Sequence, residues 1–470
     1  MTELSAVPTQ TPISRLPETA SRPMAERYEM GRAQRQKTPR AAHAEWDAPP
    51  RRDMLALLEA SNQGRTESLI PIRHGRMLAS PFAFYRGAPA VMAYDLAQTP
   101  NSGIVVQLCG DCHISNFGMY ASPERELVFD LNDFDETLPG PFEWDVKRTA
   151  ASIVVAARNA GLSGNDAKTA VRMALQLYRE KIHEFAAASY LGTWYSRTEA
   201  NVLLEMTQKQ HRKTAQIQLA RVQQKDRLQA FAKLTEAVVG ERRIIHNPPW
   251  FFRLEKREED IREWLTELLV AYYESLEDSR KRLMARYRFV DVAHKVVGVG
   301  SVGTRCFITY WEGNDGGDPL FLQVKQASAS LLEPYLGRSQ YEHPGQRVIT
   351  GQRLMQATND IFLGYAHSAG HDYVVRQLYD MKGSANLEIM PATYLTRNAA
   401  LCGAVLARAH ARTGDAAQIA GYIGKSSRFD EALVEFAYRY AVQNETDFAA
   451  FKRAVRDGRL EARMSEENTR

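Results

Sequence analysis

Residues Val105 to Glu136 read VVQLCGDCHISNFGMYASPERELVFDLNDFDE. Two apolar runs in this stretch flank the polar turn ASPERE, which indicates a short hairpin. Asp111 and Asn116 stand five positions apart before the turn, and an acidic cluster closes the second run: Asp130, Asp133, Asp135 and Glu136. Crowded carboxylates repel one another, so the cluster predicts a bound metal ion or neighbouring arginines.

The order of these groups is one that phosphoryl-transfer enzymes use. Such enzymes combine an Asp-x-x-x-x-Asn loop, a hairpin and an apolar-x-Asp-Phe segment. One carboxylate takes a proton from the acceptor, while an amide and a second carboxylate hold magnesium. Phosphoryl transfer is therefore the hypothesis that the other segments have to support.

Composition is that of an ordinary soluble protein, with 44% hydrophobic and 25% charged residues among 470. The length allows about two to three domains. The net charge of +4 is small for this length and does not favour nucleic-acid binding. Neither a run of about 18 apolar residues nor an apolar signal segment is present, so we expect a cytoplasmic protein without membrane contact.

The four cysteines are too few for a disulfide framework: Cys109, Cys112, Cys306 and Cys402. Cys109 and Cys112 form a C-x-x-C next to His113, which leaves zinc or redox chemistry open. No second ligand pair follows, and the motif does not open a helix. We favour reduced thiols packed beside a functional loop.

A glycine-rich segment follows a long helical and charged region. Val290 to Gly313 contains G-x-G-x-x-G, formed by Gly298, Gly300 and Gly303 with Ser301 between them. A dinucleotide-binding fingerprint would open a helix here, whereas CFITYW is typical of a returning strand. The segment predicts a glycine-rich β-hairpin whose backbone amides approach nucleotide phosphates.

Lys325 lies in a third predicted strand, PLFLQVKQAS, in the setting of a phosphate-binding lysine. The helix predicted at Gly345–Leu363 has no glutamate, so the partner of Lys325 stays unassigned. Glu333 and Glu342 precede that helix. A strand with Gln377, followed by YDMKGS, is predicted to be a hinge that receives adenine through backbone groups.

Three arginines near the N-terminus offer a phosphate clamp because a guanidinium matches phosphate oxygens. They are Arg73, Arg76 and Arg86, and structural ion pairing to the acidic cluster is the alternative. A second loop, HARTGD at His410–Asp415, is a rival catalytic loop. Ala420 stands where its metal-binding amide should be, which argues against it.

The loop CGDCHISNFG at Cys109–Gly118 resembles the catalytic loop H-G-D-x-H-x-x-N of aminoglycoside phosphotransferases and choline-kinase-type enzymes, with cysteine at the first position. LNDFDE resembles their metal-binding segment. The resemblance implies that Asp111 is the general base, that Asn116 and Asp133 bind Mg²⁺, and that Asp145 braces the loop. His113 would support the site, and Asp145 could also cap its helix. For Asp130, Asp135 and Glu136, a second ion and solvation are both open.

Most of the chain also resembles the bacterial family catalogued as domain of unknown function 2252. The matching motifs are RM-x-x-SPFAFYRG, GDCHISNFG, FDLNDFDETLPGPFEWDVKR and VRQLYDMKGS. That family name brings no established substrate.

The kinase resemblance implies an α+β, bilobal, protein-kinase-like fold. The glycine-rich hairpin and Lys325 come about 190 residues after the catalytic loop, whereas kinases have them first. The order therefore predicts a circular permutation. We expect a disordered tail at 1–26, a helical lobe with the catalytic and metal loops at 27–285, a β-rich nucleotide-binding lobe at 286–380, and a hinge with returning helices at 381–470.

The expected function is ATP-dependent phosphotransfer, with Mg²⁺, to an unidentified small-molecule or protein acceptor. AMP transfer, as in selenoprotein-O-like kinases, fits most of the same residues. The missing helix glutamate leaves a nucleotide-binding scaffold with little turnover as a further alternative. All three require that Lys325 and Asp133 face each other across one cleft.

Overall fold

The structure is a computed structural model. It describes residues 22–464 except 200, 203–211, 224–226, 239–240, 249, 253–257, 297, 299, 301, 315–316, 379–382, 384–386 and 388–389. Residues 1–21 of the tail predicted at 1–26 lie outside the described residues. Its last residues begin helix α1 (Met24–Ala33), so the tail prediction was too long. Helix α1 is ordered because it packs on α17 (Ala416–Ile423), with Arg27 paired to Asp415 at 2.7 Å.

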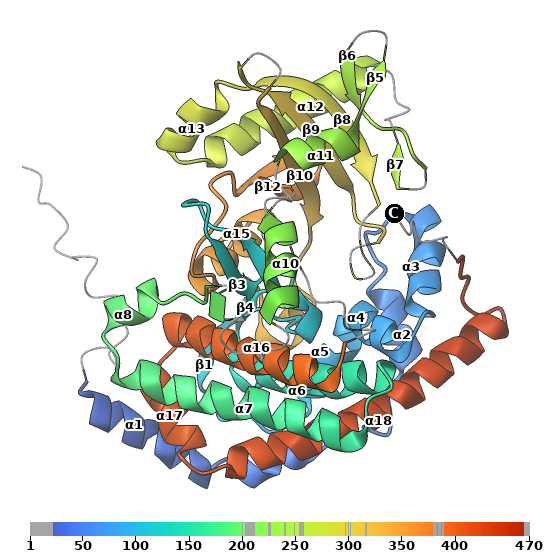
Figure 1. Cartoon of the computed structure of the whole chain (residues 1–470). Helices are drawn as coiled ribbons and strands as arrows, with labels where there is room; N and C mark the ends of the chain where they lie inside the picture. Colours follow the sequence, from blue (N-terminus) through green and yellow to red (C-terminus); the bar gives the residue numbers. More distant parts are fainter. Residues whose placement is uncertain are drawn as a thin grey trace, which may run out of the picture.

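The chain has an α+β architecture, in which a six-stranded antiparallel sheet lies above a helical body (Figure 1). The strand order is β11-β12-β10-β9-β8-β7. The strands are β7 (Phe251–Phe252), β8 (Arg288–Lys295), β9 (Cys306–Glu312), β10 (Pro319–Ala327), β11 (Gly364–Ser368) and β12 (His371–Gln377).

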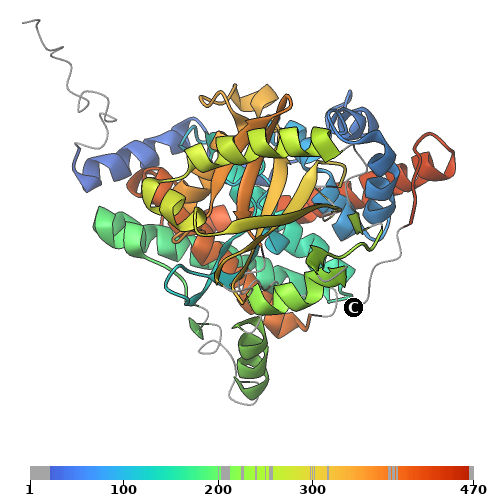
Figure 2. The same ribbon diagram turned by 90° about the horizontal axis from the view of Figure 1, so that it is seen from above.

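Helices cover both faces of this sheet. On one face α12 (Glu258–Ser275) contributes Leu268 and Tyr272, and α13 (Asp278–Met284) contributes Met284, to a core shared with Val324. Figure 2 shows α12 crossing over the strands. On the other face α11 (Arg227–Leu234) packs near Phe321. The hairpin of β5 (Thr235–Val238) and β6 (Glu241–Ile244) follows α11 directly.

The helical body is built from long helices with apolar faces. They are α6 (Glu143–Asn159), α7 (Gly164–Ala187), α16 (Ala392–Thr413), α17 and α18 (Arg428–Arg456). Gly403 on α16 allows a close approach of α16 to α7, because a Cβ there would lie 2.0 Å from the Ala174 carbonyl oxygen. Serine and aspartate caps begin several helices; Ser163 and Asp166 form a capping box at α7.

Shorter elements surround the body. The helices are α2 (Met54–Ala60), α3 (Ile70–Met77), α4 (Pro81–Gly87), α5 (Pro89–Ala97), α8 (Tyr190–Tyr195), α10 (Arg212–Gln223), α14 (Glu333–Leu336) and α15 (Pro344–Met355), and the short 3-10 turns are η3 (Gln34–Gln36), η4 (Arg40–Ala44), η5 (Glu67–Leu69) and η6 (Ile114–Asn116). Two small two-stranded sheets contain the segment from Val105 to Glu136 and its continuation to Pro141. They pair β1 (Val105–Leu108) with β4 (Leu138–Pro141), and β2 (Phe117–Ala121) with β3 (Leu127–Leu131).

Several sequence predictions hold in the fold. Strands β8 and β9 form an antiparallel pair around the glycine-rich segment, with Ala293 opposite Ile308, and β10 is the next strand. The hairpin around ASPERE is the β2–β3 pair. Among the described residues, none of the helices has the length and apolar character needed to cross a membrane.

Two element predictions were wrong. The helical lobe was expected to extend to residue 285, but β5, β6 and β7 interrupt it, and α12 and α13 pack on the sheet. Their apolar stripes fit a sheet face as well as a helix bundle, so periodicity could not assign them. The helix expected at 345–363 ends at Met355, and the Asp360 carboxylate in the following turn accepts hydrogen bonds from the Phe362 and Gln377 backbones.

Candidate functional site

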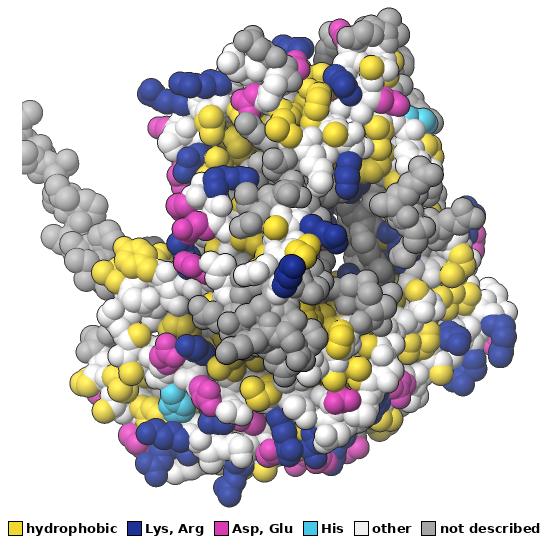
Figure 3. Space-filling model, viewed as in Figure 1, with side chains coloured by type: hydrophobic (Ala, Val, Ile, Leu, Met, Phe, Trp, Pro, Cys, Tyr) yellow, Lys and Arg dark blue, Asp and Glu magenta, His cyan; other side chains and the backbone are white. Residues whose placement is uncertain are grey.

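A pocket of about 480 Å³ lies between the sheet and the helical body; we call it the central pocket. It brings together most of the residues that the sequence singled out: Asp111, His113, Asn116, Asp133, Gly298, Gly300, Lys325, Arg76 and Arg86. On the face drawn in Figure 3 the surface is hollowed between these two parts. Asp133 and Lys325 therefore face one cleft, although 192 positions separate them in the chain.

The loop that carries Asp111 is held from behind by Asp145. The Asp145 carboxylate accepts hydrogen bonds from the Cys109 N–H (2.7 Å) and the Gly110 N–H (3.0 Å). Gly110 has a φ of +88°, and a Cβ there would lie 2.4 Å from the Glu136 carbonyl oxygen. Only glycine fits this position without strain. Of the two roles considered for Asp145, these contacts correspond to bracing.

Asp111 is paired with Arg148, one turn further along α6 than Asp145. The Arg148 Nε donates to the Asp111 carboxylate at 2.6 Å. Arg148 is 2% exposed, and its guanidinium also lies over the Tyr85 ring at 4.5 Å. Burial raises the pKa of Asp111, and Asp133 adds to the rise, although Arg148 opposes it. A raised pKa makes this carboxylate a better proton acceptor near neutral pH.

Asn116 and Asp133 supply oxygen ligands beside Asp111. The Asn116 Nδ2 donates to the Asp111 carbonyl oxygen at 2.6 Å, which leaves the amide oxygen of Asn116 as the ligand atom. The Asn132 N–H holds the Asn116 backbone at 2.8 Å. Two carboxylates and one amide oxygen at one pocket are hard ligands of the kind that Mg²⁺ prefers. The donor set therefore fits a magnesium ion.

Lys325 forms an ion pair with Asp135 of the segment LNDFDE. This pair supplies the partner that the sequence left unassigned. Burial lowers the pKa of Lys325, but Asp135 and Asp133 outweigh burial and raise it. The lysine is therefore charged at neutral pH and lies where it meets anionic groups in the central pocket.

Asp130 and Glu136 are occupied elsewhere, so neither open role for them holds. Asp130 is 1% exposed and pairs with Arg408 of α16 at 2.6 Å. Glu136 accepts hydrogen bonds from the Leu331 N–H at 2.6 Å and the Ser330 hydroxyl at 3.3 Å. Asp130 is thus a buried structural carboxylate and Asp133 faces the central pocket, whereas Asp135 and Glu136 are partly buried and line a neighbouring pocket.

Substitution Glu136→Gln is expected to reduce the pH dependence of stability. Burial raises the pKa of Glu136 from 4.5 to about 7, although Arg347 opposes the rise. Between these pH values the folded protein keeps a proton that the unfolded chain has lost, so this group lowers stability as pH rises through that window. Glutamine keeps an acceptor for the Leu331 N–H without the ionisation.

Thermal unfolding at pH 5, 6, 7 and 8 measures this effect. The variant should gain melting temperature relative to the parent at pH 8 and gain little at pH 5. Glu184→Gln is the matched control, because the Glu184 side chain is 61% exposed. Its melting temperature should differ from that of the parent by the same amount at pH 5 and at pH 8. If the melting temperatures of Glu136→Gln and the parent differed by the same amount at every pH, Glu136 would not have the raised pKa inferred here.

The central pocket is rich in cationic side chains, some of which the sequence analysis missed. Arg76 and Arg86 line it, together with Lys295, Lys325 and Arg376. Arg376 is oriented by Gln323, which accepts from its Nε at 2.9 Å. Arg376 and Lys295 sit in strand-like runs without a motif, so only strand pairing places them at the pocket. Arg148 was detectable, because it lies three positions after Asp145 on one helix.

Arg73 is not part of the central pocket, so only Arg76 and Arg86 of the three arginines considered for a phosphate clamp lie there. Its guanidinium is 1% exposed and donates to the Gly87 carbonyl oxygen at 2.6 Å and to Asn62 at 2.5 Å. It joins α3 to α4. Ion pairing of Arg73 with the acidic cluster is not observed either, because its contacts are to uncharged groups.

Two predicted nucleotide-binding positions lie away from the central pocket. Gly303, with a φ of +90°, accepts a hydrogen bond from the Thr66 N–H at 2.7 Å and anchors the end of the glycine-rich segment. The Gln377 N–H is already bonded to Asp360 at 2.5 Å and cannot donate to an adenine base. Ser301 lies outside the described residues, as does most of the YDMKGS hinge.

The rival loop and the C-x-x-C motif have structural roles. His410 is fully buried between Tyr178 and Asp145, and Asp415 caps α17. Cys109 and Cys112 are free and buried, and burial raises the pKa of the Cys112 thiol. Burial also lowers the pKa of His113 far below its usual value, so this imidazole is neutral. The prediction of thiols packed beside the loop is confirmed.

A family model described as an uncharacterized protein conserved in bacteria, domain of unknown function 2252, matches residues 65–454. The chain belongs to this family. The matched region of the domain of unknown function 2252 family contains every residue that lines the central pocket. No curated protein and no solved structure matches the chain.

Proposed function

We propose that the protein is an ATP-dependent phosphotransferase with a circularly permuted, kinase-like order of segments. The observation that carries this proposal is the central pocket itself. The base, amide and metal-ligand candidates from the first third of the chain share it with Lys325 and the backbone of Gly298 and Gly300, which come more than 160 positions later. Phosphoryl transfer needs little covalent chemistry from a protein; it needs positioned phosphates, a charge-stabilising environment and a proton acceptor.

Asp111 accepts the proton of the acceptor hydroxyl or amine as the γ-phosphate is transferred. Its pairing with Arg148 fixes the carboxylate towards the pocket, and its raised pKa suits this role. Asn116 and Asp133 would hold Mg²⁺, which when bound neutralises phosphate charge. Asp145 acts as a positioning residue, because its contacts hold the backbone on which Asp111 stands.

The cations of the pocket bind the phosphates of ATP. Lys325 and Arg376 approach from the sheet, and Arg76 and Arg86 approach from α3 and α4. A guanidinium can bind phosphate oxygens in a bidentate manner, whereas the lysine acts as a point charge. The exposed backbone of Gly298 and Gly300, where a Cβ would meet little, leaves room for the anion.

A second candidate function is transfer of AMP. It uses the same base, metal-ligand candidates and cations of the central pocket, whereas the pairing of Lys325 with Asp135 in place of a helix glutamate bears on the scaffold alternative. The same pocket would then hold ATP with its α-phosphate, not its γ-phosphate, near the acceptor. A scaffold that binds ATP without turnover is the third outcome.

ATP labelled separately at the α- and γ-phosphates distinguishes these functions. The full chain is incubated with each label, Mg²⁺ and a small-molecule extract, and products are separated by size and charge. We expect γ-label in a small molecule or on protein, and a matching intact-mass increase if the acceptor is protein. Transfer of α-label would assign AMP transfer. Saturable ATP binding with neither transfer would overturn both enzymatic proposals.

A further inference from the structure

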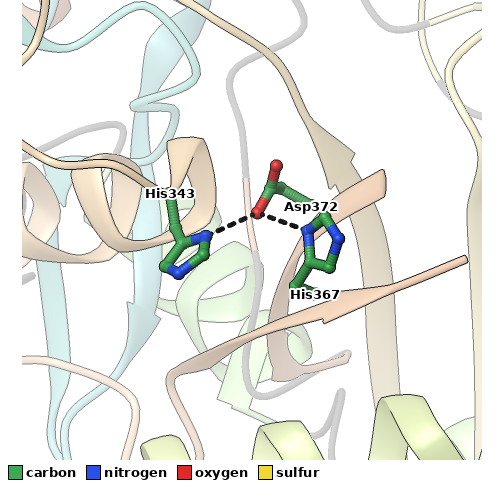
Figure 4. A group of neighbouring side chains, drawn as sticks. All are labelled: His343, His367 and Asp372. Carbon is green, nitrogen blue, oxygen red and sulfur yellow. Dashed lines mark hydrogen bonds and ion pairs between the residues drawn. The ribbon is translucent and has the colours of Figure 1, made fainter. Parts of the chain in front are cut away.

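A second group of ligand-type side chains lies outside the central pocket, at the edge of the sheet. His343, His367 and Asp372 place their nitrogen and oxygen atoms within 4.8 Å of one another. Figure 4 shows both imidazoles turned towards the same carboxylate oxygen. The His343 Nδ1 and the His367 Nδ1 lie 3.3 Å and 3.2 Å from the Asp372 Oδ1.

The three residues come from three elements that the fold holds rigidly. His367 on β11 is directly opposite Asp372 on β12, so both side chains leave the same face of the hairpin. The two strands are joined by the tight turn Ala369-Gly370, in which both residues have positive φ. His343 is the residue before the first turn of α15, and Gly345 packs that turn on the hairpin because a Cβ there would lie 2.5 Å from the Tyr373 carbonyl oxygen.

We propose that His343, His367 and Asp372 form a binding site for a divalent transition-metal ion, with Zn²⁺ as the best fit. Two imidazole nitrogens and one carboxylate oxygen are a ligand set that Zn²⁺ accepts, with a water molecule in the fourth position. The spacing of the ligand atoms is close to that of a tetrahedral site, so small side-chain rotations suffice. Imidazole nitrogens disfavour Mg²⁺ and Ca²⁺, which separates this site from the oxygen-lined central pocket.

Access to the site is open on one side. The side chains of His343 and His367 are 41% and 49% exposed, and that of Asp372 is 18% exposed. A hydrated ion can therefore enter from solvent without any movement of the backbone. In the absence of metal, the His367 Nδ1–H can donate to Asp372, and metal binding replaces this hydrogen bond.

The bound ion would fix the start of α15 on the β11–β12 hairpin. One turn further along, Arg347 donates to the carbonyl oxygens of Asp135 at 2.7 Å and Thr137 at 2.6 Å. Asp135 is the partner of Lys325, so α15 connects the metal site with the central pocket. The inference does not depend on the proposed phosphotransfer, because metal binding is measured directly.

Cobalt substitution tests the site on the full chain. The protein is freed of metal with chelator, and Co²⁺ is added while visible absorption is recorded. We expect one Co²⁺ per chain with the strong absorption of a tetrahedral, nitrogen-containing site, and displacement by Zn²⁺. His343→Gln and His367→Gln should each weaken binding at least about tenfold.

His371→Gln is the matched control, because His371 lies on the same hairpin but outside the three-residue group. Its affinity should equal that of the parent. Hydrogen exchange of α15 should slow on metal addition in the parent and in this control, and stay unchanged in His343→Gln. Absence of saturable binding, or binding that survives loss of both His343 and His367, would overturn the site. Weak octahedral absorption removed by Asp133→Asn would assign the ion to the central pocket instead.

Discussion

Substitution Asp111→Asn is expected to lower kcat by about 10²–10⁴-fold while ATP binding stays within about twofold of the parent. Asparagine keeps the size and can still accept the hydrogen bond from Arg148, but it cannot take up the acceptor's proton. Turnover is measured with γ-labelled ATP, and binding is measured separately by fluorescence of a nucleotide analogue. Loss of kcat without loss of binding is the pattern of a group that acts in the transition state.

Asp415→Asn is the matched control for this experiment. Asp415 belongs to the rival loop HARTGD, caps α17 and pairs with Arg27. Asparagine is a good N-cap, so the fold should be kept and turnover should stay near the parent value. If Asp415→Asn abolishes turnover and Asp111→Asn does not, the rival loop is the catalytic one and the role given to Asp111 is wrong.

Substitution Arg408→Met is expected to destabilise the protein by about 3–5 kcal/mol, because it leaves the buried Asp130 carboxylate without its counter-ion. Asp130 and Arg408 are 1% and 2% exposed, and Arg408 also donates to the Met355 carbonyl oxygen at the end of α15. The pair joins β3 to α16 inside the helical body. Urea denaturation of parent and variant, followed by fluorescence, gives the change in the free energy of unfolding.

Two further variants make the stability result specific. Asp130→Asn combined with Arg408→Met should recover part of the loss, since asparagine carries no charge and its one amide oxygen still accepts from either the Leu131 or the Ala357 N–H group. Arg439→Met removes an exposed pair with Glu435 and should cost less than about 1 kcal/mol. An Arg408→Met variant as stable as Arg439→Met would show that the buried pair contributes little.

Much of the candidate site was predictable because its chemistry is local in sequence. Asp111 and Asn116 precede the β2–β3 hairpin and Asp133 follows it, so the hairpin brings these two ends of one short segment together. The glycine-rich hairpin was predictable for the same reason, since a β-branched run, glycines and a returning apolar run specify an antiparallel pair. Asp145 was singled out because it lies in the first turn of a predicted helix, where a carboxylate is favoured by the free backbone N–H groups.

The three candidate residues that lie outside the central pocket could not be recognised from local sequence. Gln377, Gly303 and Arg73 have residue types that fit a phosphate or nucleotide site, but each is already engaged by a neighbour distant in sequence. No local pattern encodes those neighbours.

The sequence by itself determined most helices, the β2–β3 hairpin, the strands around the glycine-rich segment and the residues that we propose to hold magnesium and accept a proton. Turn chemistry and apolar periodicity act over a few residues, so a single chain segment contains that information. Only the tertiary structure decided which carboxylate pairs with which cation. Lys325 meets Asp135, Asp111 meets Arg148 and Asp130 meets Arg408, because tertiary packing sets the distances between side chains that lie from 37 to 278 positions apart. Burial also decides which of these charges remain available to a ligand. A buried charge has to be paired with an opposite charge of the protein, because it has lost its contact with water.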